Sequence, residues 1–324
     1  MKPRDRVEGA LRGCELEQLP VIPLIGAHSA VIAGRDPREA FLNGEVMGEL
    51  QVKAVELYEP DGAFHYMDLT VEAEALGAEI GFRGGAPVVV NHVIPGGFEF
   101  SVERGRIGVY ARATRILAEE LGSRFFIGAY VTGPLTLALE LVGAKPVMRW
   151  LVKGTGSISD LLLKISEFVI EYAKLLVESG ADCVMVLEPS CTLASPRAFS
   201  RVMPLIDRVC RAVSSMDAYP ILHICGDAGH LLRLLPNIEA SAYHLDSKVS
   251  LREARRVVGS KCLMGNIDTR LLLTGSEGDV VRAVRRCVGE MGSKLYIVSA
   301  GCEIPPQTPP ENLNALIRAV KLSH

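Results

Sequence analysis

The sequence predicts an α/β fold, a (β/α)8 TIM barrel with an N-terminal helical extension and one inserted β-hairpin. Short apolar runs of strand length alternate with longer stretches of helical periodicity along the chain. An open doubly wound sheet is the alternative, but no Gly-rich dinucleotide fingerprint follows the first run, and GTGS at 154–157 lacks a strand before it. The length of 324 residues suits one such barrel, so residues 1–324 are predicted to form a single domain.

Eight apolar runs are the predicted strands of the barrel. Each has the length of a strand and is separated from the next by residues typical of helices or turns. The runs cover residues 21–26, 62–67, 125–131, 182–188, 219–225, 242–246, 262–268 and 295–301.

Amphipathic segments between the runs are the predicted helices. Residues 160–180 and 277–292 show helical periodicity, and each segment ends in the glycine expected just past a helix. Residues 81–97 are instead rich in glycine and proline, which predicts a hairpin inserted in the larger pattern. Residues 1–20 alternate charged and apolar side chains, unlike the continuous apolar core of a secretory signal.

The composition limits the partners of the protein. The formal net charge is −3, from 35 basic and 38 acidic residues that are mixed along the chain. This balance argues against a nucleic acid or a membrane as the main partner and favours a small molecule or another protein. The early apolar stretch 21–34 is too short to span a bilayer, so we expect a cytoplasmic protein. Its eight scattered cysteines are expected to be mostly reduced thiols.

The stretch LHICGDAG carries a histidine and a cysteine two positions apart at the end of the fifth predicted strand. Side chains at i and i+2 of a strand share a face, so His223 and Cys225 would lie side by side. Such a pair alone is more often a core histidine beside an inert cysteine. However, Cys302 follows the eighth predicted strand and would reach the same C-terminal mouth. These three ligands suit Zn²⁺ with a fourth position open.

Other polar residues occupy the same predicted rim. Glu188 ends the fourth strand, where it is a candidate fourth ligand or catalytic base, or else a residue that caps the following helix. His244 and Asp246 share a face of the next strand, and Asn266 lies at the end of the seventh. We expect His244, Asp246 and Asn266 to line the cofactor site, with an ordinary polar strand end as the alternative.

Several motifs resemble the uroporphyrinogen decarboxylase superfamily, and most of all its zinc-dependent branch of cobalamin methyltransferases, of the methylcobamide:coenzyme M methyltransferase type. The similarity covers nearly the whole chain in order, and its most specific part is His-x-Cys-Gly with a later Gly-Cys. The motifs are VEAEALGAEI, GPLTLALELVG, HICGDAGHLL, MGNID and SAGCEIPPQTPPENLNALIRAV. In that branch the residues matching His223, Cys225 and Cys302 are zinc ligands. The resemblance also implies an acidic residue near the site, and of Asp68, Glu72 and Glu74 we select Glu72 as catalytic.

The resemblance implies methyl transfer between a corrinoid, methylcobalamin on a separate partner protein, and a small thiol such as coenzyme M. The oligomeric state is left open. Uroporphyrinogen decarboxylation is the rival activity, but the region PLIGAHSAVIAGRDPREAF offers only Arg35 and Arg38 to hold the carboxylates of a porphyrinogen. A non-catalytic relative that binds a corrinoid protein is the second alternative.

Overall fold

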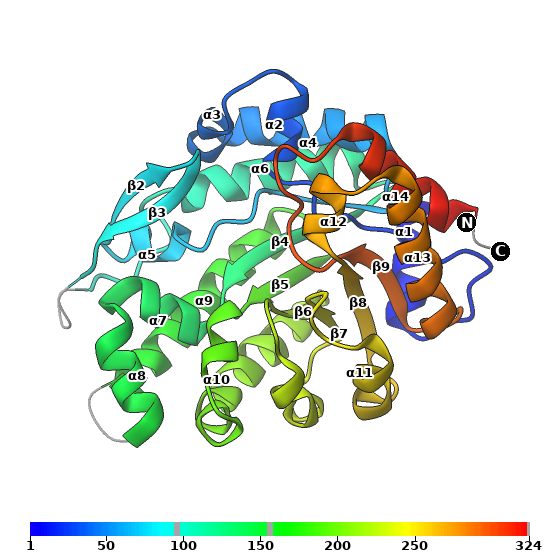
Figure 1. Cartoon of the computed structure of the whole chain (residues 1–324). Coiled ribbons are helices and arrows are strands. Elements are labelled where there is room, and N and C mark those ends of the chain that lie inside the picture. The colour runs from blue at the N-terminus through cyan, green and yellow to red at the C-terminus, as the bar shows by residue number, and fades with distance from the viewer. Residues whose placement is uncertain (94–97, 154–157, 323–324) are drawn as a thin grey trace.

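The computed structural model describes residues 1–93, 98–153 and 158–322. Seven parallel strands form one sheet in the order β1-β4-β5-β6-β7-β8-β9, which curls around a central interior (Figure 1). The predicted α/β barrel class is therefore confirmed. The strands are β1 (Gly62–Phe64), β4 (Phe126–Thr132), β5 (Cys183–Leu187), β6 (Tyr219–Ile224), β7 (Ala242–Leu245), β8 (Cys262–Ile267) and β9 (Tyr296–Ala300).

The predicted strand at residues 21–26 is wrong as a strand, because this segment makes only an isolated parallel bridge between Val21 and Val298. The segment still closes the ring, since the Asp61 N–H before β1 donates to the Val21 carbonyl at 2.8 Å. Pro23 follows two residues later and has no N–H to extend the pairing. The eighth position of the barrel is thus filled by a very short segment.

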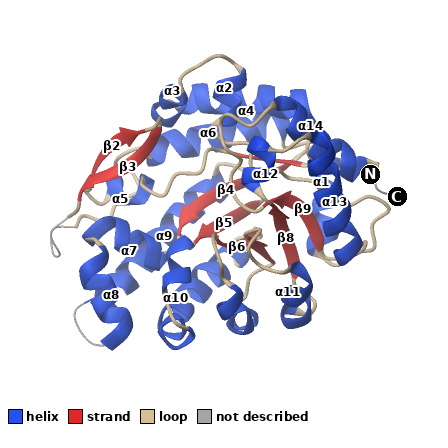
Figure 2. Cartoon of the chain, in the orientation of Figure 1, coloured by secondary structure: helices blue, strands red, loops and turns tan. Residues whose placement is uncertain are grey.

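Helices surround the sheet (Figure 2). The predicted N-terminal extension is helical, and the helices predicted at 160–180 and 277–292 are α9 and α13. Of the helices in the described ranges, none combines the length and the apolar character needed to cross a membrane. The helices are α1 (Pro3–Leu11), α2 (His28–Ile32), α3 (Pro37–Leu42), α4 (Gly44–Tyr58), α5 (Val71–Ala75), α6 (Ile107–Leu121), α7 (Pro134–Val142), α8 (Ala144–Lys153), α9 (Ile158–Glu178), α10 (Pro196–Ser214), α11 (Leu251–Val258), α12 (Thr269–Thr274), α13 (Glu277–Met291) and α14 (Pro310–Lys321), with 3₁₀ segments η1 (Pro189–Leu193) and η2 (Gly229–Asn237).

The predicted hairpin is confirmed as an antiparallel pair, β2 (Glu79–Arg83) and β3 (Ala86–Asn91), on the outer side of the helices. Its turn is Gly84-Gly85, with φ values of +60° and +88°. Two successive positive φ values favour glycine, because a side chain is strained in this conformation. The last predicted positions, 94–97, and the GTGS motif at 154–157 lie outside the described residues.

Side chains fill the interior of the barrel. In β5, Cys183, Met185 and Leu187 belong to one buried cluster, whereas Val184 and Val186 between them pack in the cluster that includes the helices. This separation follows from strand alternation, which sends successive side chains to opposite faces of the sheet. Because the interior is packed, a functional site in this fold belongs at the C-terminal ends of the strands.

Candidate metal centre

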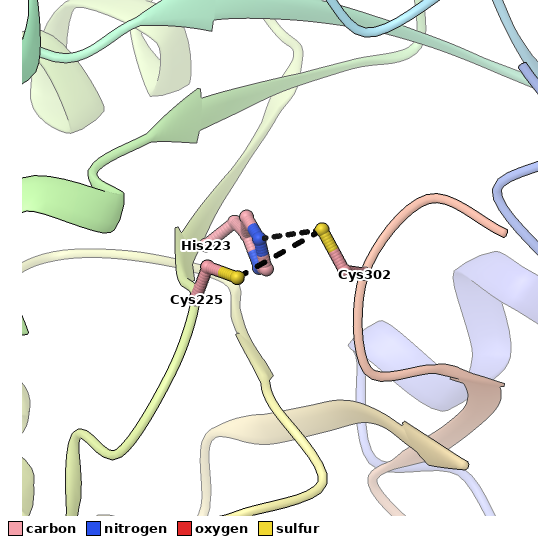
Figure 3. Close-up of side chains that lie close together, drawn as sticks. All are labelled: His223, Cys225 and Cys302. Atoms are coloured by element: carbon pink, nitrogen blue, oxygen red, sulfur yellow. Dashed lines mark hydrogen bonds between the residues drawn. The ribbon is translucent and has the colours of Figure 1, made fainter. Parts of the chain in front are cut away.

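Three side chains from two strand ends meet at the C-terminal rim of the sheet. His223 lies near the end of β6, Cys225 directly follows that strand, and Cys302 lies just past β9. Their ligand atoms all lie within 4.8 Å of one another. The two sulfur atoms are 3.9 Å apart, and Cys302 Sγ is 3.7 Å from His223 Nε2 (Figure 3). The structure therefore brings together the three residues that the sequence predicts as metal ligands.

The orientation of the His223 ring leaves one nitrogen for a ligand. Nδ1 lies 3.3 Å from the carbonyl oxygen of His244, and since a carbonyl only accepts, Nδ1 carries the proton of that hydrogen bond. Nε2 then presents its lone pair toward Cys302. The His223 ring also contacts the His244 ring, with centroids 4.5 Å apart and ring planes tilted by 35°. A backbone carbonyl that fixes the far nitrogen of an imidazole is the usual support of a metal-binding histidine.

The two cysteines differ in acidity. A hydrogen bond with Cys302, and to a smaller extent one with His223, lowers the pKa of the Cys225 thiol to about 5. The pKa of the Cys302 thiol is raised well above its ordinary value, because it shares this hydrogen bond and is largely withdrawn from water. Both side chains remain partly accessible. Two thiols and an imidazole at these distances match the donor set of Zn²⁺ in sites with an open position.

The predicted cofactor-site residues surround this cluster. The Asp246 carboxylate lies 3.5 Å from Cys225 Sγ and accepts a hydrogen bond from the Gly226 N–H at 2.9 Å. The Asn266 side-chain amide donates to the Asp246 carbonyl at 3.0 Å, and His244 Nε2 donates to the Ala300 carbonyl at 2.8 Å. In this structure Asp246, Asn266 and His244 hold the segments that carry the candidate ligands, and cofactor contact stays a prediction.

Glu188 does not join the cluster. Its carboxylate is fully buried and accepts hydrogen bonds from the Leu135 N–H at 2.9 Å and from the N–H and hydroxyl of Thr136 at 3.0 and 2.8 Å. These donors lie in the first turn of α7, where backbone N–H groups have no partner within the helix. Glu188 thus caps α7, which precedes it, rather than the helix that follows. Burial raises the pKa of this carboxyl to about 7.

Changing Glu188 to glutamine is expected to leave the metal content unchanged and to lower the free energy of unfolding by about 1–3 kcal/mol, because the new amide NH₂ faces N–H donors. Metal analysis and urea unfolding of the Glu188→Gln variant would measure both effects. A variant that unfolds normally but loses its metal would return Glu188 to the ligand set.

Glu72, selected above as catalytic, also lies outside the cluster. Its buried carboxylate accepts hydrogen bonds from the N–H and the hydroxyl of Thr132 at 2.6 and 2.8 Å, at the end of β4. Burial raises the pKa of Glu72 to about 7. These contacts connect α5 to the barrel rim. Glu72 is not part of the cluster of candidate ligands, and its catalytic role stays a prediction.

The neighbouring acids are held by a buried arginine. Arg106 Nη1 donates to Asp68 at 2.6 Å, and Arg106 Nε donates to Glu74 at 2.6 Å. The hydroxyl of Tyr110 donates to the same Asp68 oxygen at 2.6 Å. The N–H and hydroxyl of Thr70 donate to the other Asp68 oxygen, so both oxygens of this carboxylate have partners within the protein.

Sequence reasoning missed Glu303, the residue after Cys302. Its carboxylate accepts a hydrogen bond from the Met67 N–H at 2.7 Å, and burial raises its pKa to about 8. Glu303 and Met67 line a cavity of about 710 Å³ that extends toward Arg38 and the hairpin turn at Gly84. The adjacency to Cys302 was the available signal, but the partner of the carboxylate lies far away in the sequence.

The chain is similar over nearly its full length to methyltransferases and to decarboxylases. Methylcobamide:CoM methyltransferase MtaA of Methanosarcina barkeri (strain Fusaro / DSM 804) is 28% identical, over 98% of this chain and 96% of that protein. A uroporphyrinogen decarboxylase of Streptomyces avermitilis is 26% identical, over 96% of this chain and 93% of that protein. A solved methyltransferase from Methanosarcina mazei superposes with a TM-score of 0.90 at 28% identity, covering 99% of this chain and 98% of that one.

The model of one protein family, described as uroporphyrinogen decarboxylase (URO-D), matches residues 2–322. This match spans the barrel, the hairpin and all three candidate ligands. The chain therefore belongs to the uroporphyrinogen decarboxylase family.

Proposed function

We propose that this protein is a zinc-dependent methyltransferase that moves a methyl group between a corrinoid on a partner protein and a small thiol such as coenzyme M. The observation that carries the proposal is the cluster of His223, Cys225 and Cys302 at the barrel rim. Similarity to methylcobamide:CoM methyltransferases over nearly the full length supports it. Similarity to decarboxylases is also present, so the site residues have to separate the two activities.

The charges around the rim favour methyl transfer over decarboxylation. A porphyrinogen with four or more carboxylates needs several fixed cations. Arg106 is paired with the carboxylates of Asp68 and Glu74, and Arg35 is paired with Glu39. Arg38 is exposed, with its guanidinium over the Phe82 ring at 5.7 Å. Two adjacent thiols at the strand ends have a function in a zinc enzyme and none in a decarboxylase without a metal.

In the proposed reaction, His223 Nε2 and the sulfurs of Cys225 and Cys302 would hold the metal. Bound there, zinc supplies a Lewis acid that keeps an incoming thiol as thiolate at neutral pH. Asp246 fixes the turn after Cys225, and among the predicted rim residues its carboxylate, rather than that of Glu188, lies beside the cluster.

Methyl transfer then requires the rim to hold the thiol sulfur in line with the methyl group of the corrinoid. A sulfur–carbon bond forms as the cobalt–carbon bond of the corrinoid breaks, cobalt keeps the electron pair as Co(I), and the thiol proton is released. The corrinoid protein would dock over the barrel mouth, where the η1 segment after β5 exposes Leu193.

Adding coenzyme M to the zinc-loaded protein is expected to raise the sulfur count at the metal from two to three and to release about one proton per site near neutral pH. X-ray absorption would count the sulfurs, and calorimetry in buffers of different ionisation enthalpy would count the protons. 2-Hydroxyethanesulfonate, which has a hydroxyl in place of the thiol, is the matched control and should do neither. A count that stays at two sulfurs, with no proton released, would favour the decarboxylase or the non-catalytic alternative.

A further inference from the structure

The glycine of the Gly-Cys motif, Gly301, is not used by the proposed reaction. Its φ angle lies outside the left-handed region that favours glycine, so backbone strain does not explain it. A Cβ at this position would instead lie 2.7 Å from the backbone nitrogen of Ser247 and 3.1 Å from Asp246 Cα. A carbon atom cannot come so close to a backbone nitrogen unless the chain shifts. The missing side chain thus lets the segment before Cys302 lie directly against the turn after β7.

The same turn, residues 246–247, also contacts the segment that carries the other cysteine. The Asp246 carboxylate accepts a hydrogen bond from the Gly226 N–H at 2.9 Å and lies 3.5 Å from Cys225 Sγ. Gly226 is the glycine of the His-x-Cys-Gly motif and has a φ of +85°. Two glycines, each next to a candidate ligand cysteine, therefore contact one turn, which we call the β7 turn.

Hydrogen bonds hold both sides of the contact between Gly301 and the β7 turn. The Asn266 amide donates to the Asp246 carbonyl at 3.0 Å, and the Lys248 N–H donates to the Asp246 carboxylate at 3.0 Å. On the other side, the Gly301 N–H donates to the Ile267 carbonyl at 2.8 Å. A methyl group added between the two segments would therefore have to push them apart.

We infer that Gly301 is a positioning residue, which with the β7 turn sets the separation of the Cys225 and Cys302 sulfurs and so the size of the metal ion that the centre accepts. The inference rests on the proposed function and concerns the fit of its metal. The two sulfurs are 3.9 Å apart, a separation that two Zn–S bonds of about 2.3 Å can span. Cd²⁺ takes the same sulfur ligands but is larger, so it suits a wider pair.

The test is the Gly301→Ala variant, prepared without metal and titrated with Zn²⁺ and with Cd²⁺. The added methyl group widens the sulfur pair, so the Kd for Zn²⁺ should rise by about 10–100-fold, the range found when a supporting contact of a metal site is lost. The Kd for Cd²⁺ should change far less, because its longer bonds tolerate a wider pair. Competition with a chromogenic chelator would measure both values, and thermal unfolding of the metal-free protein would measure stability.

Gly48→Ala is the matched control for crowding. A Cβ at Gly48 in α4 would lie 2.8 Å from Ile116 Cβ in α6, so this variant should lower stability and leave both Kd values unchanged. Gly289→Ala in α13 is the control for the substitution itself, because the added Cβ would have no described atom within 4 Å. It should change neither the Kd values nor the packing.

A Gly301→Ala variant that binds zinc like the wild type, or that loses affinity for both ions by the same factor, overturns the inference while the proposed function stands. If that variant does not fold, Asp246→Ala tests the other contact of the β7 turn. It releases the Gly226 N–H and should again weaken zinc binding more than cadmium binding, and unchanged zinc affinity would overturn the inference. A wild-type protein that binds neither ion overturns both the inference and the proposed function.

Discussion

Replacing Cys302 by alanine is expected to abolish zinc binding and to lower methyl transfer by more than about a hundredfold. Loss of a group that only supports a metal ligand lowers activity by up to about a hundredfold, and loss of the ligand itself should cost more. The free energy of unfolding should change by about 1 kcal/mol or less, because the side chain is partly accessible and lies past the end of β9. Cys225→Ala should behave in the same way. In this fold the packed core lies elsewhere, so a lost ligand affects chemistry more than stability.

Metal analysis, turnover with methylcobalamin and coenzyme M, and thermal unfolding would measure the three quantities on each variant. The exposed Cys14 near α1 provides the matched control, since Cys14→Ala removes a thiol at the far end of the chain from the cluster. Wholesale unfolding of either ligand variant at room temperature would make the metal structural. Retention of zinc by the Cys302→Ala variant would remove Cys302 from the ligand set.

The largest effect on stability is expected at Arg106. Its guanidinium lies 2.6 Å from carboxylate oxygens of both Asp68 and Glu74, and only 7% of its side chain is exposed. The Arg106→Leu variant leaves these carboxylates without their cation, so its free energy of unfolding should fall by about 3–5 kcal/mol. Urea unfolding would measure the loss, and the zinc content of the folded variant should stay normal.

Two further variants distinguish the effect of breaking a buried ion pair on stability from the effect of removing a positive charge. Arg104→Leu removes a pair with Glu99 that is exposed on both sides and should cost less than about 1 kcal/mol. The double change Arg106→Leu and Asp68→Leu should recover part of the stability, because it also removes one uncompensated carboxylate. A loss below about 1 kcal/mol in Arg106→Leu would contradict this structural role of the acidic cluster.

The structure differs from two expectations of the sequence analysis, and the reasons are different. The strand predicted at 21–26 has an apolar composition, but Pro23 ends its pairing. The proline is visible in the sequence, but the prediction gave more weight to the apolar residues around it. Glu188 was correctly placed at a strand end, yet the direction of its carboxylate depends on where α7 begins beside it. Composition alone carries no information about such a neighbour.

The sequence by itself determined the barrel class, the hairpin and the three candidate ligands. Strand alternation puts His223 and Cys225 on one face, and parallel strands bring Cys302 to the same rim, so local rules suffice. Only the tertiary structure decided which acids stay buried in caps and ion pairs, and that the Glu303 carboxylate accepts a hydrogen bond from the Met67 N–H. Those outcomes depend on how segments remote in the chain pack across the barrel, where desolvation leaves a polar group only the partners that the fold brings within reach.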